Sequence, residues 1–371
     1  MKIFKILLMR LFINKILILT KLIIKNNYIT NKLFINEIAR RFKKQGKINI
    51  NEVENLIKKK KFLNDSNIKN IIHIGFTLDP GYILQTMLTV ASIMATQDKQ
   101  TKIIFHFGVV NNFTAIHMIK IYNLRSKINI LTEFNFYYLK ESIEKMKNFH
   151  PSGEACPGKF ELPQLLTDDI HKLLLFDAGD VLIFRDLTEL YNYDMKEFWV
   201  LGTPEPAQIY PHKEYNITKY LNIGSLLFNI KELKKNKFWE LYSKNRNLKL
   251  IGQPDQSLFN IICPDNKKDY FPFRFGGLTP FASDKDSDEL KYMNYGINDW
   301  LESNYSKTFP ENPGTQEKIA VNLYNPMFIH QWYGKWHDGG GLSIFRLIAK
   351  YFIKLAGIWD ELCQIKPGYC K

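Results

Sequence analysis

Two short apolar runs flank a pair of carboxylates at residues 173–184, and this pattern constrains the fold more than any other stretch of the chain. Residues 173–176 and 181–184 each predict a buried strand, because they are apolar without interruption and short. Asp177 and Asp180 lie between these runs. Burial of two negative charges at the mouth of a strand is unfavourable unless a cation offsets it.

Two interpretations of Asp177-Ala178-Gly179-Asp180 are open. Carboxylate oxygens are hard ligands that suit Mg²⁺ or Mn²⁺, and a metal held in this way can bind the phosphates of a substrate. Alternatively, the segment is an ordinary turn, since Asp and Gly are common turn residues. The other motifs of the chain are needed to choose between the two.

Composition restricts the class of protein. The chain has 371 residues, of which 45% are hydrophobic, so it can bury a large core in one or two domains. The net charge of +14 suits phosphates, polyanions or an anionic membrane face. However, the Lys residues are scattered and no nucleic-acid-binding motif occurs, so we expect no nucleic-acid partner. The four cysteines lack Cys-x-x-Cys spacing, which argues against zinc but leaves a disulfide open, for example between Cys363 and Cys370.

The N-terminal segment, residues 1–69, is basic and its apolar residues are repeatedly interrupted by Lys and Arg. A membrane-spanning helix needs about 20 largely apolar residues, so the segment is a poor candidate for one. It also lacks the apolar core of a cleaved signal peptide. A basic helix on a membrane surface and a helix or stem packed on the domain both remain open. Localisation is accordingly open among cytoplasmic, membrane-associated and secretory.

Strands and helices alternate from residue 70 onward. We expect strands at residues 71–76, 102–109, 127–131, 133–139 and 173–176, and helices at 84–95, at 115–124 and within 159–170. This order predicts a mostly parallel sheet with helices on its faces. Ligands bind beyond the carboxyl ends of such strands, where residues 77–82 and 177–180 both fall. Neither a dinucleotide-binding glycine motif nor a Walker loop occurs.

The second half of the chain has a looser pattern. A strand is expected at residues 198–202, a loop entering a buried strand at 221–229, a helix at 231–244, a helix opening near Pro254 and a strand at 327–330. The apolar residues Phe345, Ile348, Phe352, Leu355, Trp359 and Leu362 predict one amphipathic helix near the C-terminus. Packing against the core and binding to a membrane or partner are both open for this helix.

Seven short motifs follow one another in a fixed order. They are Phe76-Thr77-Leu78-Asp79-Pro80-Gly81-Tyr82, Lys159-Phe160-Glu161-Leu162-Pro163, Asp177-Ala178-Gly179-Asp180, Leu221-Asn222-Ile223-Gly224, Asp255-Gln256 with Asn260, His330, and Gly334-Lys335-Trp336. In this order they resemble glycosyltransferase family 8, a retaining group that uses a sugar nucleotide, usually a UDP-sugar, with Mn²⁺. The resemblance covers residues 71–336 and implies a GT-A type, Rossmann-like α/β fold, with extra helices at both ends of the chain.

The resemblance implies a role for each motif at the donor. Thr77, Leu78 and Asp79 would line the base, and Tyr82 would stack on the uracil, as a flat aromatic face allows. Lys159 would contact the phosphates or the sugar of the donor.

The resemblance also implies that Asp177, Asp180 and His330 ligate the metal, a set of oxygen and imidazole ligands that suits Mn²⁺ or Mg²⁺. The chain departs from the family here, because the two Asp residues of the family are two positions apart and these are three apart. Asp180 is therefore preferred over Asp177 as a ligand. A tight turn at Gly179 would let both carboxylates converge, since Gly tolerates unusual backbone angles.

The remaining motifs are placed around the reacting centre. Asn222 and Gly224 would border the donor sugar, and Asp255 and Gln256 would lie beside its anomeric carbon. Gly334 and Lys335 resemble a segment that clamps the diphosphate, although here its proline is absent and its spacing is compressed.

These observations lead to three segments. Residues 1–69 form a basic N-terminal segment, residues 70–338 a catalytic domain and residues 339–371 a C-terminal amphipathic helix. The resemblance implies a metal-dependent retaining enzyme that transfers a hexose or related sugar from a UDP-sugar to a glycan, protein or lipid acceptor. The alternative is a non-catalytic protein on the same fold that binds a sugar nucleotide or a membrane surface, because fold alone does not establish activity.

Overall fold

The computed structural model describes residues 68–110, 113–128, 130–139, 155–204, 215–248, 254–272, 275–278, 327–330 and 343–365. All of them except residues 114–116 belong to one compact unit, Leu63–Phe113 with His117–Lys371, and the description below concerns this unit. The predicted N-terminal segment, residues 1–69, lies almost wholly outside the described residues and remains a prediction.

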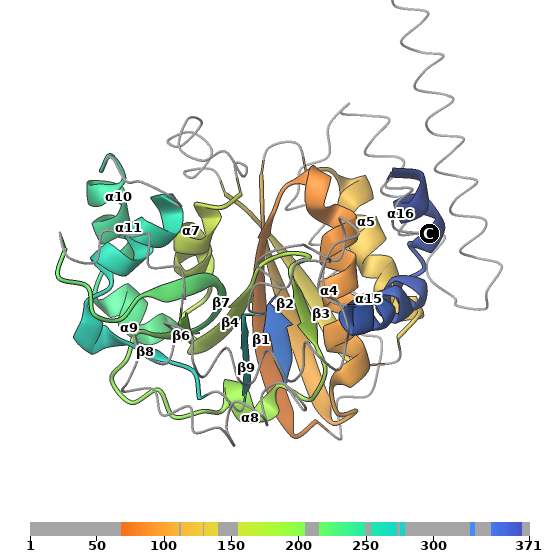
Figure 1. Ribbon diagram of the computed structural model, residues 1–371, viewed down its shortest axis with the longest axis horizontal. Coiled ribbons are helices and arrows are strands. Elements are labelled where there is room, and N and C mark those ends of the chain that lie inside the picture. Colours follow the sequence, from red (N-terminus) through yellow and green to blue (C-terminus); the bar gives the residue numbers. More distant parts are fainter. Residues whose placement is uncertain are drawn as a thin grey trace, which may run out of the picture. The chain divides into compact units, whose positions relative to one another are not determined.

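A seven-stranded mixed sheet forms the centre of this unit (Figure 1). Its order is β3-β2-β1-β4-β7-β6-β8. The strands are β1 (Asn70–Leu78), β2 (Thr101–Val109), β3 (Thr132–Tyr138), β4 (Lys172–Phe176), β6 (Val200–Pro204), β7 (Leu221–Asn229) and β8 (Lys268–Tyr270). The first four strands of the order are parallel, as predicted, whereas β7 runs antiparallel to both β4 and β6. A small second sheet has the order β5-β10-β9, with β5 at Val181–Ile183, β9 at Gly276–Leu278 and β10 at Phe328–His330.

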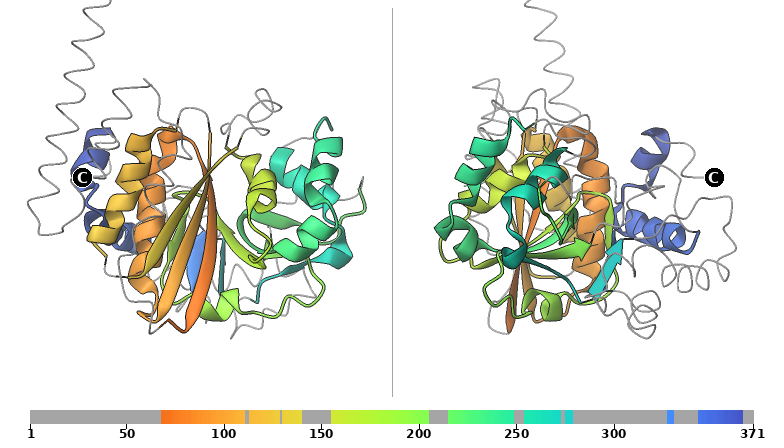
Figure 2. Two further views of the ribbon diagram at one scale, coloured as in Figure 1. Left: turned by 180° about the vertical axis from the view of Figure 1, so that it is seen from behind. Right: turned by 60° about the vertical axis from the view of Figure 1, so that its left-hand side comes forward.

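Helices cover both faces of the large sheet. They are α4 (Ile83–Thr96), α5 (Ala115–Tyr122), α7 (Gly158–Leu165), α8 (Thr188–Tyr191), α9 (Ile230–Lys235), α10 (Phe238–Asn245), α11 (Pro254–Ile262), α15 (Ser343–Ala356) and α16 (Trp359–Ile365), with 3-10 turns η2 (Pro80–Tyr82), η3 (Asn123–Ser126) and η4 (Asp265–Lys267). Figures 1 and 2 show α4 and α5 on one side of the sheet and α7, α10 and α11 on the other. This arrangement explains why the central strands are apolar on both faces.

The core of the parallel half is an aromatic row that crosses three strands. Phe76 of β1, Phe105 and Phe107 of β2 and Phe134 of β3 are 0–1% exposed, and neighbouring rings lie 5.3–6.3 Å apart. Burial of one such side chain contributes about 2–3 kcal/mol to folding. The row fixes the register of β1, β2 and β3, and therefore aligns their carboxyl ends.

The structure corrects the sequence prediction at several connections. The described residues of the strand predicted at 127–131 form a turn and bends that lead into β3, and Ile128 and Ile130 are buried there. The helix predicted at 231–244 is two helices, α9 and α10, since Lys237 adopts a positive φ of 54° between them. Residues 221–229 are strand throughout rather than a loop entering a strand, because Leu221 and Asn222 pair with the end of β6.

The C-terminal segment packs on the core. Ala349, Ile353 and Ala356 of α15 are fully buried, and α15 lies against α4. The single helix that was predicted is broken into α15 and α16 at Gly357, whose φ of 65° places it in the left-handed region that commonly ends a helix. Lys127 donates a hydrogen bond of 2.6 Å to the carbonyl oxygen of Ala356 at this break.

Two further findings concern the ends of the described chain. Cys363 is disulfide-bonded, as the sequence allowed, and its suggested partner Cys370 lies outside the described residues. Within the part of the chain that is described, no helix combines the length and the apolar character needed to cross a bilayer.

A hydrogen-bonded row of two histidines and a tyrosine crosses β1, β2 and β3. His73 Nδ1 lies 2.9 Å from His106 Nε2, and His106 Nδ1 lies 3.0 Å from the hydroxyl oxygen of Tyr137. Burial lowers the pKa of His73 below its ordinary value of 6.5, against the opposing charges of Asp169 and Glu133. The folded protein therefore binds fewer protons at His73 than the unfolded chain does.

We expect the free energy of unfolding to fall as the pH falls below 6.5 and through the lowered pKa of His73. The contribution is fully present above 6.5 and is lost in acid, because protonation of a buried imidazole is unfavourable. Urea unfolding of the native protein and of His73→Gln at several pH values measures this. The pH dependence should be smaller in the variant, whose amide can still reach His106 but does not titrate. An equal pH dependence in the two proteins would contradict this assignment.

Candidate functional site

The candidate site begins where β4 ends. Asp177 follows Phe176, and its backbone N–H donates a hydrogen bond of 2.8 Å to the carbonyl oxygen of Gly224 on β7. The chain then turns at Gly179, which has a φ of 83°. The tight turn expected at this glycine is therefore present. A Cβ atom at Gly179 would lie 2.2 Å from Cβ of Gln85 on α4, so the turn requires glycine for space as well as for conformation.

Three ligand-type side chains converge beyond this turn. Asp180 leads directly into β5, and β5 pairs with β10 in a register that places His330 opposite Val181. One atom from each of Asp177, Asp180 and His330 lies within 4.8 Å of the other two. Asp180 and His330 are buried, whereas the Asp177 side chain is 29% exposed. Asp177 and Asp180, which are three positions apart, thus lie close to His330, which is 150 positions after Asp180.

The absence of a side chain at Gly224 lets two of these side chains pack closely against the β7 backbone. A Cβ atom there would lie 2.1 Å from Cε1 of His330 and 2.5 Å from Oδ2 of Asp177. Two carboxylates and one imidazole are a ligand set that suits a hard divalent cation such as Mn²⁺. The residues present therefore fit a metal of the kind expected from the sequence.

Lys159 of α7 adds a positive charge to the site. Its Nζ atom lies 2.5 Å from Oδ1 of Asp177, and its side chain is 8% exposed. Burial alone lowers the pKa of Lys159, but the negative charges of Asp177 and Asp255 outweigh this effect and hold the pKa above its usual range. Lys159 is therefore a fixed cation between two of the predicted site carboxylates.

Cys156 lies where the charges of the site meet, and the sequence did not single it out. Burial and the charges of Asp255, Asp177 and Asp79 raise the pKa of its thiol to about 12, against the opposing charge of Lys159. These four charged residues are therefore close enough to Cys156 to act on its charge. The signal available in the sequence was its position three residues before Lys159.

The residues predicted beside the base lie at the end of β1. Asp79 accepts a hydrogen bond of 2.7 Å from the N–H of Gly81, and the N–H of Tyr82 donates one of 3.2 Å to the carbonyl oxygen of Asp79. The predicted turn is thus a 3-10 turn capped by Asp79. Leu78 is buried, whereas Thr77 is partly exposed and lies beside the start of α7.

The residues predicted beside the sugar belong to β7 and α11. Asn222 accepts a hydrogen bond of 2.9 Å from the N–H of Gly224, and Gln256 accepts one of 3.2 Å from the N–H of Ile223. Both side chains are at most 2% exposed. Their amide oxygens therefore hold the backbone of β7 at Ile223 and Gly224. Asp255 is also buried, in the first turn of α11.

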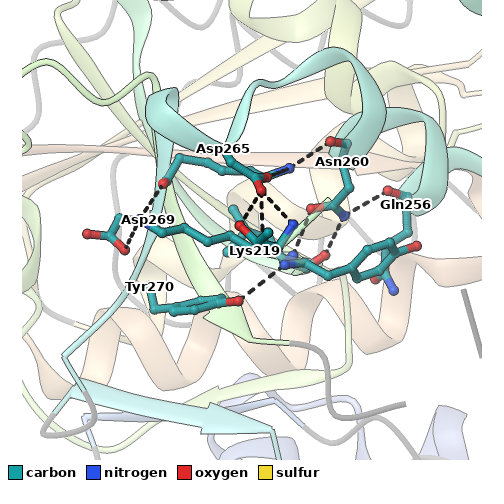
Figure 3. Close-up of polar contacts among 10 residues, drawn as sticks. Lys219, Gln256, Asn260, Asp265, Asp269 and Tyr270 are labelled. Atoms are coloured by element: carbon teal, nitrogen blue, oxygen red, sulfur yellow. Dashed lines mark hydrogen bonds and ion pairs between the residues drawn. The ribbon is translucent and has the colours of Figure 1, made fainter. Parts of the chain in front are cut away.

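Asn260 secures the start of β7 by acting as a neighbouring strand would. Its Oδ1 accepts from the N–H of Leu221 and its Nδ2 donates to the carbonyl oxygen of the same residue, both at 2.8 Å. Figure 3 shows Asn260 and Gln256 on the same side of this network. The register of β6 and β7 shifts between Gly202 and Thr203, so regular pairing is interrupted at this point.

A buried lysine extends the network of Figure 3 to the surface. Lys268 is 0% exposed, and its Nζ donates a hydrogen bond of 2.6 Å to the carbonyl oxygen of Asn260. It also lies 3.1 Å from Oδ1 of Asp265, whose other oxygen accepts from the backbone and side chain of Thr218. This network joins α11, β7 and β8 into one support beneath the site. Gly334 and Lys335, predicted to clamp the diphosphate, lie outside the described residues.

Comparison with known proteins identifies the fold. The galactosyltransferase LgtC, solved in complex with donor and acceptor sugar analogues, has a TM-score of 0.57 at 16% identity, over 77% of this chain and 95% of LgtC. The bifunctional glycosyltransferase WbbM gives 0.58 at 13% identity, over 83% of this chain and 53% of WbbM. GlyE of Streptococcus pneumoniae TIGR4 gives 0.50 at 15% identity, over 79% and 64% of the two chains. At such identities these likenesses show a shared GT-A fold.

The sequence itself identifies the family. A search of curated protein sequences gave no match. The sequence model of glycosyl transferase family 8, in contrast, matches residues 73–275, which is more than half of the chain and contains the Asp177–Asp180 turn, β7 and α11. The chain therefore belongs to glycosyltransferase family 8 and is a sugar-transferring enzyme with a GT-A fold.

Proposed function

We propose that this glycosyltransferase uses a divalent cation and a UDP-sugar, and that it transfers a hexose or related sugar with retention of configuration to a glycan, protein or lipid acceptor. The observation that carries the proposal is the convergence of Asp177, Asp180 and His330, two of which pack closely against Gly224. This convergence lies at the carboxyl ends of β1 and β4, where parallel sheets bind their ligands.

Asp177, Asp180 and His330 would hold the cation, and the mixed oxygen and nitrogen set suits Mn²⁺ or Mg²⁺. A cation bound there supplies Lewis acidity that neutralises negative charge on the departing diphosphate. Lys159 adds a second positive charge that is already fixed in place by Asp177 and Asp255. Fixed charges directed at a leaving group stabilise the transition state without further reorganisation.

The other residues orient the donor. Asp79 and Tyr82 lie at the end of β1, where the Tyr82 ring offers a flat face to a base. Asp255 is a buried carboxylate near Lys159, and its negative charge favours positive charge that develops on an anomeric carbon. Asn222 and Gln256 fix the β7 backbone at Gly224 and Ile223, beside the proposed metal ligands. We assign no nucleophile. Retention is compatible with a covalent carboxylate intermediate and also with attack of the acceptor on the face from which the leaving group departs.

Replacement of one predicted ligand tests the metal site. Asp180→Asn keeps the shape of the side chain but removes its charge, so turnover of a UDP-sugar should fall by about 100-fold or more. UDP should raise the melting temperature of the native protein more with Mn²⁺ than without it, because a ligand of the folded state stabilises that state. The extra shift with Mn²⁺ should be lost in the variant. Asp168→Asn is the control, since Asp168 is an exposed carboxylate on the surface. An unchanged Mn²⁺ effect in Asp180→Asn would exclude Asp180 as a ligand.

The close approach of Asp177 and His330 to Gly224 provides a second test. Gly224→Ala should reduce Mn²⁺ binding, measured by titration calorimetry, because the added methyl group would collide with Asp177 and His330. Gly202→Ala is a matched control in the adjacent strand, where a Cβ would lie 2.7 Å from a leucine side chain instead. The melting temperature should fall in both variants, because both are crowded. Mn²⁺ binding should weaken only in Gly224→Ala. Native Mn²⁺ affinity in Gly224→Ala would contradict the proposed position of the cation.

A further inference from the structure

Helix α4 carries a row of three buried hydroxyl groups, those of Thr86, Thr89 and Ser92. All three residues are 0% exposed, in a helix that is buried on most of its surface by apolar residues. A hydroxyl group in such surroundings is unfavourable unless it forms a hydrogen bond. The partners of these groups therefore show what the row does.

Thr89 binds the turn between the two carboxylates. Its Oγ1 accepts a hydrogen bond of 3.1 Å from the backbone N–H of Gly179, and this bond is buried. The same turn touches α4 directly, because Gly179 leaves no room for a Cβ atom above Gln85. Asp177 and Asp180 stand at the two ends of this turn. The position of the turn on α4 therefore sets the separation of their carboxylates.

Ser92 binds the strand that follows the turn. The N–H of Phe184 donates to Met327 beside β10, so the preceding N–H, that of Ile183, points to the opposite edge of β5. Ser92 Oγ accepts from this N–H at 3.1 Å and donates to the carbonyl oxygen of Thr89 at 2.7 Å. The serine thus satisfies a buried strand edge and connects it to the residue that holds the turn.

A third contact continues the attachment. The side-chain oxygen of Gln97, at the end of α4, accepts a hydrogen bond of 2.8 Å from the N–H of Leu187. The segment from Gly179 to Leu187 is therefore bonded to α4 through three backbone N–H groups. Because α15 packs against α4 as well, this helix is held firmly while it holds the segment.

We propose that Thr89 and Ser92 are positioning residues for the divalent-cation site. Their hydroxyl oxygens fix the backbone on either side of Asp180, and so bring its carboxylate to the separation from Asp177 and His330 that a cation requires. This inference rests on the proposed metal-dependent function. It extends that function to a helix that contributes none of the three proposed ligands.

Removal of the Thr89 hydroxyl should weaken the cation site. Thr89→Val keeps the branched shape of the side chain but removes the oxygen that accepts the hydrogen bond from the N–H of Gly179. Loss of an outer partner of a metal ligand lowers metal affinity by about 10- to 100-fold, and we expect this range for Mn²⁺. Titration calorimetry, with free Mn²⁺ followed by electron paramagnetic resonance, measures it without substrate. Thr89→Ser should bind Mn²⁺ as the native protein does, because it keeps the hydroxyl group.

Thr86→Val is the matched control on the same helix. Thr86 is equally buried, but its hydroxyl donates to the carbonyl oxygen of Tyr82 within the helix and not to the turn. Both valine variants should lose stability in urea, whereas only Thr89→Val should lose Mn²⁺ affinity. Ser92→Ala, which removes the acceptor of Ile183, is a second variant if Thr89→Val does not fold. It should also bind Mn²⁺ more weakly than Thr86→Val does.

The outcomes separate this inference from the function on which it rests. Native Mn²⁺ affinity in both Thr89→Val and Ser92→Ala, in a native protein that binds Mn²⁺, would overturn the positioning role alone. Equal losses of affinity in Thr86→Val and Thr89→Val would also overturn it, since the effect would then follow stability. A native protein that binds no Mn²⁺, with or without UDP, would instead overturn the proposed metal function and this inference with it.

Discussion

Negative charge converges at the carboxyl edge of the sheet, and its neutralisation is the constraint on which the site depends. Asp177, Asp180 and Asp255 are brought there by three different elements, and two of them are buried. Lys159 compensates part of this charge through Asp177 and Asp255. Carboxylates in such surroundings favour a further cation, because burial makes uncompensated charge unfavourable. The same excess of negative charge therefore supports the divalent-cation site that we propose.

Neutral side chains from the helices hold this charged edge in place. Thr89 holds the turn between the two aspartates, while Gln256 and Asn260 of α11 hold β7, on which Gly224 lies. In each case a buried side-chain oxygen accepts a hydrogen bond from a backbone N–H. Neutral groups suit this task because they fix the backbone without adding to the charge that the site must balance.

Sequence reasoning could predict the parallel half of the sheet and the members of the site. The buried run before Asp177 and the glycine after it are local signals, and the structure has both β4 and the turn at Gly179. The order of motifs indicated His330, although its pairing with β5 is a contact over 150 residues that no local pattern encodes. The antiparallel direction of β7 and the helix break at Lys237 were not predicted. Direction depends on distant partners, and a positive φ at a lysine has no clear local signature.

The polar row of α4 shows a more general limit. Thr86, Thr89 and Ser92 interrupt an apolar helix, and a helical-periodicity argument treats them as part of its polar face. In the structure they are buried, and α15, from beyond the residues that match the family, packs against the same helix. Their hydroxyl groups bond to the carbonyl oxygens of Tyr82 and Thr89 and to the backbone N–H groups of Gly179 and Ile183. A C-terminal element outside the family match thus contributes to the rigidity of the catalytic edge, although it supplies none of the side chains that converge there.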